Sequence, residues 1–528
     1  MPSTFLGLNT AYTGLQAFQA SINTTAHNVS NTKTEGYSRQ ETNSSADRAI
    51  RTYSSYGCLG TGVVVNSIKQ VRDEYYDIKY RNNQSRLGQY DTLETYMTQI
   101  EDYLDEYTLE GMTTEWNNFF SSLSELQKNP SDDTVRNNVI NNAKSLADYF
   151  NNLSTNLKNV QIDVNEEIKN QCDQVNTLAQ NISELNKQIN MLEVHGGNAN
   201  DLRDQRNVLV DKLSNIINIE TSEQFLGNGV TYYTVTANGQ DLVANYTYYN
   251  LLTEAKTEFR NASDADGMYE LTWSNGTTFN EYSTTLRGSL KALLDVRDGC
   301  NNALELNEVV TDENGDIQYD EDGNIMRNLV IEHEPVDVPN TDYKGIPYYQ
   351  SMLNEFVNIF TSAVNEVFEK GMTTDGTPGV PMFTIQYADA PMSASSITVN
   401  DVLIEDVTRL ATQYGEEGSW TDGESKYNLV TDLLALQSAR VFNGGTGSYY
   451  LESIVTSVAI DSNKSTTFAQ NFANISNSIQ NQRLSVMGVD GDEEGMDLME
   501  YQQAYNLCSK ILSVMTEVYD KLINQTGV

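Results

Sequence analysis

Residues 6–31 read LGLNTAYTGLQAFQASINTTAHNVSN, and their apolar side chains recur at intervals of three or four residues. This spacing predicts a helix with one apolar stripe, interrupted by a polar position at Thr25. In water such a stripe needs a partner helix to cover it. The residues of the stripe are Leu8, Ala11, Leu15, Phe18, Ile22 and Val29.

The C-terminal region carries the same spacing in two runs, separated by a glycine-containing break. The first run is Phe468, Phe472, Ile475, Ile479 and Val486, and the second is Leu498, Tyr501, Tyr505, Cys508, Leu512, Met515, Tyr519 and Leu522. We therefore predict that the two ends pair as a coiled coil and become fully ordered only on assembly, because short isolated helices are marginally stable. An ordinary pair of terminal core helices would show the same spacing.

The composition argues against two classes of partner. The 528 residues include 73 acidic and 33 basic side chains, which gives a formal net charge of −40. Nucleic acid binding requires clustered Lys and Arg, and an anionic membrane surface would repel this chain. No run of about 18 apolar residues predicts a membrane span. At this length we expect two to four domains.

The cysteines and the N-terminal residues are uninformative about chemistry. Cys58, Cys172, Cys300 and Cys508 are each more than a hundred residues apart, so neither a zinc site nor a redox dithiol is predicted. Residues 1–7 lack the basic segment of a secretory signal peptide. From these features alone we would expect a cytoplasmic protein.

The middle of the chain predicts long helices and one β-rich unit. The strongest helical signal is the series Val164, Ile168, Val175, Leu178, Ile182, Leu185, Ile189 and Leu192, which ends at His195-Gly196-Gly197 and predicts a helical hairpin with residues 202–216. From about residue 219 the period changes to two, with a hairpin turn at Asn238-Gly239. A helical pattern returns at 289–298 and at 353–368.

These patterns predict a mainly α fold with a β-rich insertion (α+β, multidomain). We expect a terminal coiled-coil domain from residues 1–62 and 466–528, a helical-bundle domain from 63–218 and 346–465, and a β-rich inserted domain at 219–345. In this arrangement the two termini are neighbours in space.

No motif indicates catalysis, a cofactor or a metal. Two series, Asp312-x-Asn314-x-Asp316 and Asp320-x-Asp322-x-Asn324, resemble the start of a calcium loop but have Ile317 and Ile325 where its glycine must stand. Two hairpin turns, Asn314-Gly315 and Asp322-Gly323, explain them better. A third series at Asp490 has Tyr501 in place of the closing ligand. We therefore expect no catalytic residue, cofactor or metal ligand.

One alternative places a function in the β-rich unit. Its aromatic residues could stack on sugars, which would suit a secreted or surface-displayed carbohydrate-binding protein or enzyme with its site in 219–345. Alternating aromatic residues on strands are more often part of sheet packing. The residues concerned are Tyr232, Tyr233, Tyr246, Tyr248, Tyr249 and Trp273.

Several segments resemble the axial proteins of the bacterial flagellum. Residues 6–17, residues 28–32 and the stretch Gly36-Tyr37-Ser38-Arg39-Gln40 are similar to the N-terminal signature of these proteins, and the last stretch resembles the hook-associated protein 1 family in particular. Further matches, in the order of the family, are Asp201-Leu202-Arg203-Asp204-Gln205-Arg206, the region 287–298 and residues 498–505. The acidic region 300–345 departs from the family.

The resemblance implies a structural protein that joins the hook to the filament, outside the cell. It implies export through the flagellar type III channel without a cleaved signal peptide, and assembly through the terminal helices. The implied partners are copies of the chain itself, the hook protein, hook-associated protein 3 and an export chaperone that holds the C-terminal helix. The signature residues Asn28, Asn31, Gly36 and Tyr37 are the expected assembly motif.

Overall fold

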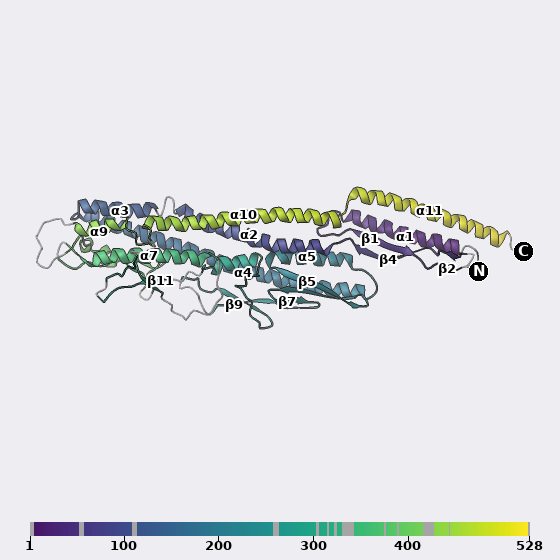
Figure 1. The fold of residues 1–528 in the computed structure, drawn as a ribbon, viewed down its shortest axis with the longest axis horizontal. Helices are drawn as coiled ribbons and strands as arrows, with labels where there is room; N and C mark the ends of the chain where they lie inside the picture. The colour runs from purple at the N-terminus through teal and green to yellow at the C-terminus, as the bar shows by residue number, and fades with distance from the viewer. Residues whose placement is uncertain are drawn as a thin grey trace.

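The computed structural model describes residues 5–51, 57–107, 113–256, 263–301, 306–313, 316–321, 325–329, 343–373, 376–387, 390–414, 427–442 and 444–525. The molecule is elongated, with a body of long helices and a narrower terminal section in which the first and last helices lie side by side (Figure 1). Small antiparallel sheets lie along one side of the body. The predicted fold class, mainly α with a β-rich insertion, is confirmed.

Helices of 9 to 61 residues form most of the body. They are α2 (Glu74–Tyr107), α3 (Thr113–Lys128), α4 (Asp133–Glu193), α5 (Asn200–Ile216), α6 (Ser289–Asp298), α7 (Ile346–Glu369), α9 (Asn428–Leu436) and α10 (Gly447–Met487). The side chain of Asp132 caps α4 by accepting a hydrogen bond from the Thr134 N–H at 2.8 Å. Gly196, with a φ of 84°, lies in the turn after α4. Helix α5 then returns along α4, so the predicted helical hairpin is present.

Helix α10 packs antiparallel on α2 along the length of the body (Figure 1). The ring of Tyr90 on α2 lies 4.9 Å from that of Phe468 and 5.4 Å from that of Phe472. Further along, Gln84 Nε2 donates a hydrogen bond to Ser476 Oγ at 3.0 Å. The contact between α2 and α10 therefore combines aromatic packing at Tyr90 with a hydrogen bond at Gln84.

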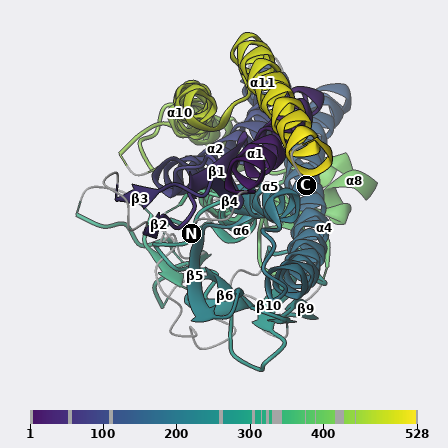
Figure 2. The same ribbon diagram turned by 90° about the vertical axis from the view of Figure 1, so that its right-hand side faces the viewer.

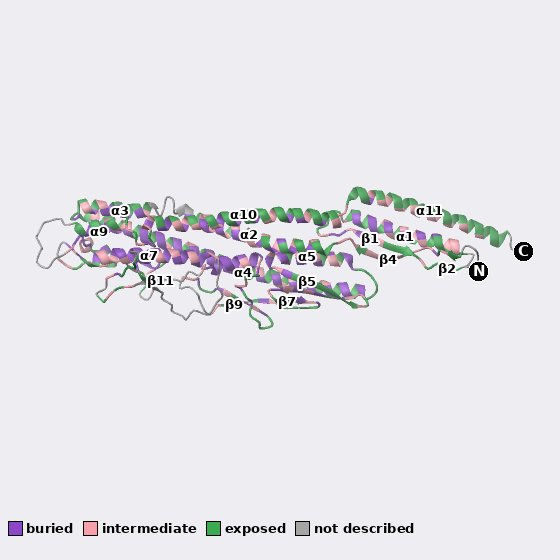
Figure 3. Ribbon diagram, in the orientation of Figure 1, coloured by how far each residue is buried: buried purple, intermediate pink, exposed green. Residues whose placement is uncertain are grey.

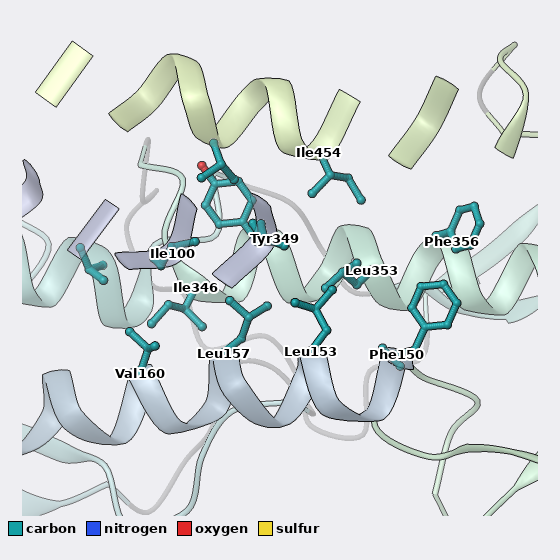
Figure 4. Close-up of a cluster of buried hydrophobic side chains, with 14 of the residues drawn as sticks. Ile100, Phe150, Leu153, Leu157, Val160, Ile346, Tyr349, Leu353, Phe356 and Ile454 are labelled. Carbon is teal, nitrogen blue, oxygen red and sulfur yellow. The ribbon is translucent and has the colours of Figure 1, made fainter. Parts of the chain in front are cut away.

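A continuous hydrophobic core joins α2, α4, α7 and α10 (Figure 4). Apolar side chains of α4 pack against those of α7, and Ile100 of α2 and Ile454 of α10 complete the cluster. None of these side chains is more than 2% exposed: Ile100, Phe150, Leu153, Leu157, Val160, Ile346, Tyr349, Leu353, Phe356 and Ile454. Such close packing makes the body sensitive to the loss of even one side chain.

The main sheet lies against α4. It contains β5 (Ile219–Gly227), β6 (Val230–Ala237), β7 (Gln240–Ala244) and β8 (Thr247–Tyr248), and β9 (Leu251–Ala255) pairs with β10 (Tyr269–Trp273). The turn between β6 and β7 is the predicted Asn238-Gly239, with both φ values positive. Asn186 and Asn190 of α4 donate side-chain hydrogen bonds to the carbonyls of Asn245 and Thr231.

Shorter pieces complete the body. They are β11 (Leu306–Val309) with β12 (Arg327–Leu329), β13 (Gly371–Met372) with β16 (Gln413–Tyr414), β14 (Phe383–Ile385) with β15 (Ile397–Val399), and α8 (Asp401–Glu405) followed by one 3-10 turn at Val407–Arg409. The predicted turns at 314–315 and 322–323 lie outside the described residues. The antiparallel bridges Thr311 to Ile317 and Tyr319 to Ile325 flank them.

The buried guanidinium of Arg297 attaches α6 to α4 and β10, and it also forms an ion pair with Asp298 of the same helix. Arg297 is fully buried, and its guanidinium donates to Asp298 Oδ2 at 2.6 Å, Asn165 Oδ1 at 3.1 Å and the Tyr269 carbonyl at 2.7 Å. Burial alone would raise the pKa of Asp298, but the charges of Arg297 and Lys256 hold it well below its usual range. The segment 287–298, noted in the sequence for its resemblance, is therefore a structural joint.

The terminal section consists of α1 (Leu6–Ser30), β1 (Gln40–Ala46), β4 (Val63–Gln70), α11 (Gly491–Asn524) and the short pair β2 (Ile50–Arg51) and β3 (Cys58–Leu59). Strand β1 reads QETNSSA, a polar sequence in which apolar and polar residues do not alternate, so its sequence carries no strand signal. Its pairing with β4 and packing on α1, rather than its own propensity, make it a strand.

The division into three domains stays a prediction. Helix α10 runs without a break from Gly447 to Met487, so the proposed boundary between residues 465 and 466 falls inside it.

The core predicts a large effect for one substitution. Phe356→Ala removes a ring that contacts Trp116, Phe150 and Phe442, with centroid distances of 5.6, 5.6 and 4.9 Å. We expect a loss of about 3–5 kcal/mol in the free energy of unfolding. Urea denaturation followed by circular dichroism measures it, with Ile162→Ala, at a side chain 44% exposed on α4, as the control. A loss no larger than that of the control would contradict the packing described.

Candidate assembly surface

The two terminal helices form an antiparallel pair. At one end the rings of Phe5 and Tyr519 are 4.9 Å apart, and at the other Asn28 Nδ2 donates to Glu494 Oε1 at 2.9 Å. Residue numbers therefore rise along α1 while they fall along the facing side of α11. The predicted pairing of the two ends of the chain is present in the structure (Figures 1 and 2).

Small and polar residues form the buried face of α1. They are Ala11, Gly14, Ala17, Ser21, Thr24, Thr25 and Asn28. A side chain at Gly14 would start only 3.1 Å from Cys508 Sγ, so the helices are in close contact there. On the other flank, Ser21 Oγ lies 2.8 Å from Thr42 Oγ1 of β1. The helix is thus held between α11 and the β1–β4 ribbon.

The predicted apolar stripe of α1 lies at the edge of this buried face. Ala11 is buried, Leu8, Leu15, Phe18 and Ile22 are only partly covered, and Val29 is 45% exposed. On α11 the predicted stripe lies toward α1. Its members Leu498, Tyr501, Tyr505, Leu512 and Met515 are partly covered, whereas Leu522 is 56% exposed. Pairing within one chain therefore leaves both stripes incompletely buried.

A second apolar stripe on α11 has no cover within the described residues. Leu507, Ile511, Val514 and Val518 follow one another at spacings of four, three and four residues and are 63, 49, 54 and 47% exposed. At 3.6 residues per turn, this stripe points about 100°, just over a quarter of a turn, away from the α1 contact. Figure 3 shows α11 exposed along nearly its whole length, and Glu494 is its one buried residue. A helix with two apolar faces requires two partners.

This second stripe was not among the predicted assembly residues. Its heptad spacing was visible, but the first stripe already explained why the segment is helical. Only the structure shows which of the two faces α1 covers.

Three residues predicted for the C-terminal assembly helix lie elsewhere. Phe472, Ile475 and Ile479 belong to α10. Phe472 stacks on Tyr90 of α2, Ile479 is 3% exposed and Ile475 is 45% exposed. The structure does not bring these residues together with α1.

The side-chain amide of Asn28 joins three segments of the chain. Nδ2 donates to the Gln40 carbonyl and to Glu494 Oε1, both at 2.9 Å. Oδ1 accepts from the Tyr37 hydroxyl at 2.8 Å and from the Gln40 N–H at 3.0 Å. All four hydrogen-bonding positions of the amide are filled, and Asn28 is 1% exposed. Burial raises the pKa of Glu494.

The remaining signature residues surround Asn28. Gly36 has a φ of 74°, and a Cβ there would lie 2.1 Å from Val208 Cγ2, so only glycine fits. The Tyr37 oxygen is 2.9 Å from His27 Nδ1, and burial together with the charge of Asp201 raises the pKa of Tyr37. Asn31 lies at the end of α1, where its Nδ2 donates to the His27 carbonyl at 3.0 Å.

A chain of charges connects this site to the body. The N–H and hydroxyl of Ser38 donate to Asp204 on α5 at 2.9 and 2.7 Å. Arg72 contacts both Asp204 and Asp77, and Arg483 at the end of α10 reaches Asp77 at 2.7 Å. Burial opposes ionisation of Asp77, but the hydrogen bond and charge of Arg72 and the charge of Arg483 lower its pKa. Burial dominates at Asp204 and raises its pKa.

The segment 201–206 supplies further bonds to this joint. Asp201 Oδ1 accepts from Gln40 Nε2 at 2.8 Å, and Arg203 pairs with Glu193 at 2.8 Å. Arg206 donates to Glu223 at 2.9 Å. The sequence of this segment showed only the family resemblance, because its bonding partners lie on other elements.

The described part of the chain was also considered for metal sites, membrane-spanning helices and sugar-stacking aromatic residues. No group of three or more His, Cys, Asp or Glu side chains there is arranged to hold a metal ion. None of the helices described is long and apolar enough to cross a membrane. Of the aromatic residues considered for sugar stacking, Tyr233 and Trp273 are 4% and 1% exposed, and Tyr232, Tyr246, Tyr248 and Tyr249 are between 36% and 42% exposed.

Two known protein families match parts of this chain. Residues 97–383, more than half of the chain, match the family described as the flagellar hook-associated protein FlgK helical domain. Residues 480–525, which include α11, match the C-terminal region of flagellar basal body rod FlgEFG proteins.

Individual relatives match along the full length. Flagellar hook-associated protein 1 of Bacillus subtilis (strain 168) is 28% identical over 100% of this chain and 99% of its own. The protein of the same name from Escherichia coli (strain K12) is 28% identical over 98% and 99%. A solved structure, the flagellar hook junction protein FlgK from Burkholderia pseudomallei, is 20% identical over 58% of this chain and 46% of its own, with a TM-score of 0.42.

The site predicts that Asn28 holds α11 in place. Asn28→Ala leaves Glu494 and the Tyr37 hydroxyl without this partner, which costs about 1–3 kcal/mol locally. We expect hydrogen exchange of the amides in residues 495–505 to accelerate about tenfold or more, since 1.4 kcal/mol corresponds to a factor of ten. Asn23→Ala, at an exposed residue of the same helix, is the control and should change nothing. Equal exchange in both variants would contradict the role of Asn28.

Proposed function

Because this chain belongs to the flagellar hook-associated protein FlgK family, we propose that it is a structural subunit of the bacterial flagellum that joins the hook to the filament. In this proposal it acts outside the cell, assembles through its terminal helices and catalyses no reaction. Its mechanism is mechanical: the α1–α11 pair builds the inner layer, and the body stands outside it.

The second apolar stripe of α11 carries this proposal. Leu507, Ile511, Val514 and Val518 are exposed at heptad spacing, although burying the remaining half of each side chain would be favourable by about 0.7–1.5 kcal/mol. The partly covered stripe of α1 offers a matching surface. When α11 of one copy lies against a neighbouring copy, both stripes leave water together.

The membership of this family also motivates a proposal for the export route and the partners. We propose that the chain travels through the flagellar type III channel without cleavage of a signal peptide, and that an export chaperone covers α11 until assembly. Its neighbours in the assembled flagellum would be copies of itself, the hook protein and hook-associated protein 3. The net charge of −40 keeps the unassembled chain soluble.

The substitution Ile511→Asp tests whether the second apolar stripe of α11 is an assembly surface. In the monomer this side chain is 49% exposed, so we expect the melting temperature to stay within about 2 °C. In the assembly the carboxylate would be buried without a partner, which costs several kcal/mol. Cells that carry the variant should form hooks, fail to swim and release filament protein into the medium, as measured by motility and by immunoblots of the culture supernatant.

Asn506→Asp is the matched control, because it adds the same charge to an exposed polar position of the same helix. It should leave motility unchanged. Normal motility in Ile511→Asp would rule out the stripe as an assembly surface. If antibody against this chain labelled the flagellum elsewhere than a narrow band between hook and filament, the proposed location would be wrong.

A further inference from the structure

The imidazole of His27 lies where the end of α1 meets the start of α5. Its Nδ1 is 2.9 Å from the Tyr37 oxygen, and its Nε2 is 3.7 Å from Asp201 Oδ2 of α5. Helix α1 contains no Asp, Glu, Lys or Arg. Histidine is the side chain whose charge ordinarily changes between about pH 5 and 8. His27 is therefore the group through which a moderate change of pH acts directly on α1.

The backbone of Gln40 decides the direction of the hydrogen bonds that lead to His27. Its N–H can only donate, so the oxygen of the Asn28 side-chain amide must face it. Its carbonyl can only accept, so the amide nitrogen must face the carbonyl. The Tyr37 hydroxyl lies 2.8 Å from Asn28 Oδ1, to which it must donate its one hydrogen. Toward His27 the hydroxyl presents a lone pair, so His27 Nδ1 must carry a hydrogen.

This constraint leaves one place for a second proton on the ring. Burial raises the pKa of Tyr37, so its hydroxyl keeps its hydrogen. Neutral His27 is then the tautomer protonated at Nδ1, with a lone pair on Nε2 that Asn31 Nδ2 faces at 3.4 Å. An added proton binds at Nε2, on the side of Asp201, and breaks none of the four hydrogen bonds of the Asn28 amide.

The surroundings of Nε2 favour a positive charge. Gln40 Nε2 donates to Asp201 Oδ1 at 2.8 Å, which leaves Asp201 Oδ2 toward His27. No Lys or Arg among the described residues forms an ion pair with Asp201. His27 also lies in the last turn of α1, and the C-terminal end of a helix is partly negative.

Among the ionisable groups on the elements around His27, carboxylates outnumber cations. Arg39 is already paired, at 3.1 Å from Glu41 and 3.3 Å from Glu493. An imidazolium in this place therefore meets net negative charge. The groups are Lys33, Glu35, Tyr37 and Arg39 in the loop after α1, Glu41 on β1, Arg72 before α2, Asp201 and Asp204 on α5, and Glu493 and Glu494 on α11.

We propose that His27 is a pH-dependent contact that fastens the terminal section to the body. Neutral His27 is held by Tyr37 as the Nδ1–H tautomer, and His27 protonated at Nε2 forms an ion pair with Asp201 of α5. The ion pair is present on the acid side of the histidine range and is lost as the pH rises, so the end of α1 is held more firmly at the lower pH. The contact lies within one chain and does not depend on the proposed assembly.

Nitrogen NMR of the full chain tests the tautomer. The chain contains three histidines, His27, His195 and His333, so labelling histidine alone with ¹⁵N gives few signals, and His27→Gln identifies those of His27. At about pH 8, where imidazole is ordinarily neutral, we expect the shift of a protonated nitrogen at Nδ1 of His27 and of an unprotonated nitrogen at Nε2. The exposed His195 should show a mixture of both tautomers. A hydrogen on Nε2 of neutral His27 would overturn the proposal.

Hydrogen exchange tests the ion pair. Amides of residues 27–30, the last turn of α1, are compared at about pH 5.5 and about pH 7.5, on either side of the ordinary histidine titration, after correction for intrinsic exchange rates. We expect protection to be about two- to fivefold greater at the lower pH, the range for partly exposed ion pairs. Asp201→Asn should abolish this difference, since it keeps the acceptor for Gln40 and removes the charge. His195→Gln is the control and should leave the difference unchanged.

The outcomes of the exchange experiment decide whether His27 and Asp201 act as one pair. Equal protection of the wild-type chain at both pH values, or a difference that persists in Asp201→Asn, contradicts the proposal. Combining His27→Gln with Asp201→Asn should remove no more of the difference than Asp201→Asn alone, because two side chains that act only on each other have nothing further to lose. A larger loss in the double variant would show that His27 acts through another group, against the proposal.

Discussion

Helix α11 presents two apolar faces, and the chain supplies a cover for one of them. The face toward α1 is closed by small residues such as Gly14, which bring the helices close. The other face, with Leu507, Ile511, Val514 and Val518, stays in water in the single chain. Hydrophobic burial is the main favourable term in protein association, so in the proposed assembly this second face is the surface at which copies of the chain meet.

The hydrogen-bonded joint around Asn28 fixes the position of α11 and so of its uncovered apolar face. Its amide bonds α1, the chain after α1 and α11 in one geometry, and the charges of Asp204, Arg72, Asp77 and Arg483 continue that geometry into α5, α2 and α10. Apolar stripes alone would tolerate slippage by a turn. A buried amide with all four positions filled does not, because any shift leaves polar groups unpaired. The joint thus sets the direction in which the terminal pair leaves the body, and with it the position of the second stripe.

Most of the confirmed predictions came from the spacing of apolar residues along the sequence. It revealed the α4–α5 hairpin, the β-rich unit with its Asn238-Gly239 turn, and the pairing of the two ends, since each depends on local spacing. It could not reveal β1, whose polar sequence becomes a strand only by pairing with β4. Nor could it show that Phe472 and Ile479 pack on α2, or that Asn28 and Glu494, far apart in the chain, share a hydrogen bond. Those facts depend on which helix faces lie together, and spacing within one helix does not contain that information.

In the proposed assembly, copies of this chain meet through the second face of α11 while the α1–α11 pair stays intact. A cryo-electron microscopy map of the region between hook and filament in intact flagella would show this arrangement or exclude it. We expect density in which α11 of each copy contacts its own α1 on one side and a neighbouring copy at Leu507, Ile511, Val514 and Val518 on the other. A map in which this stripe faces open solvent, or in which α1 and α11 of one chain have separated, would contradict it.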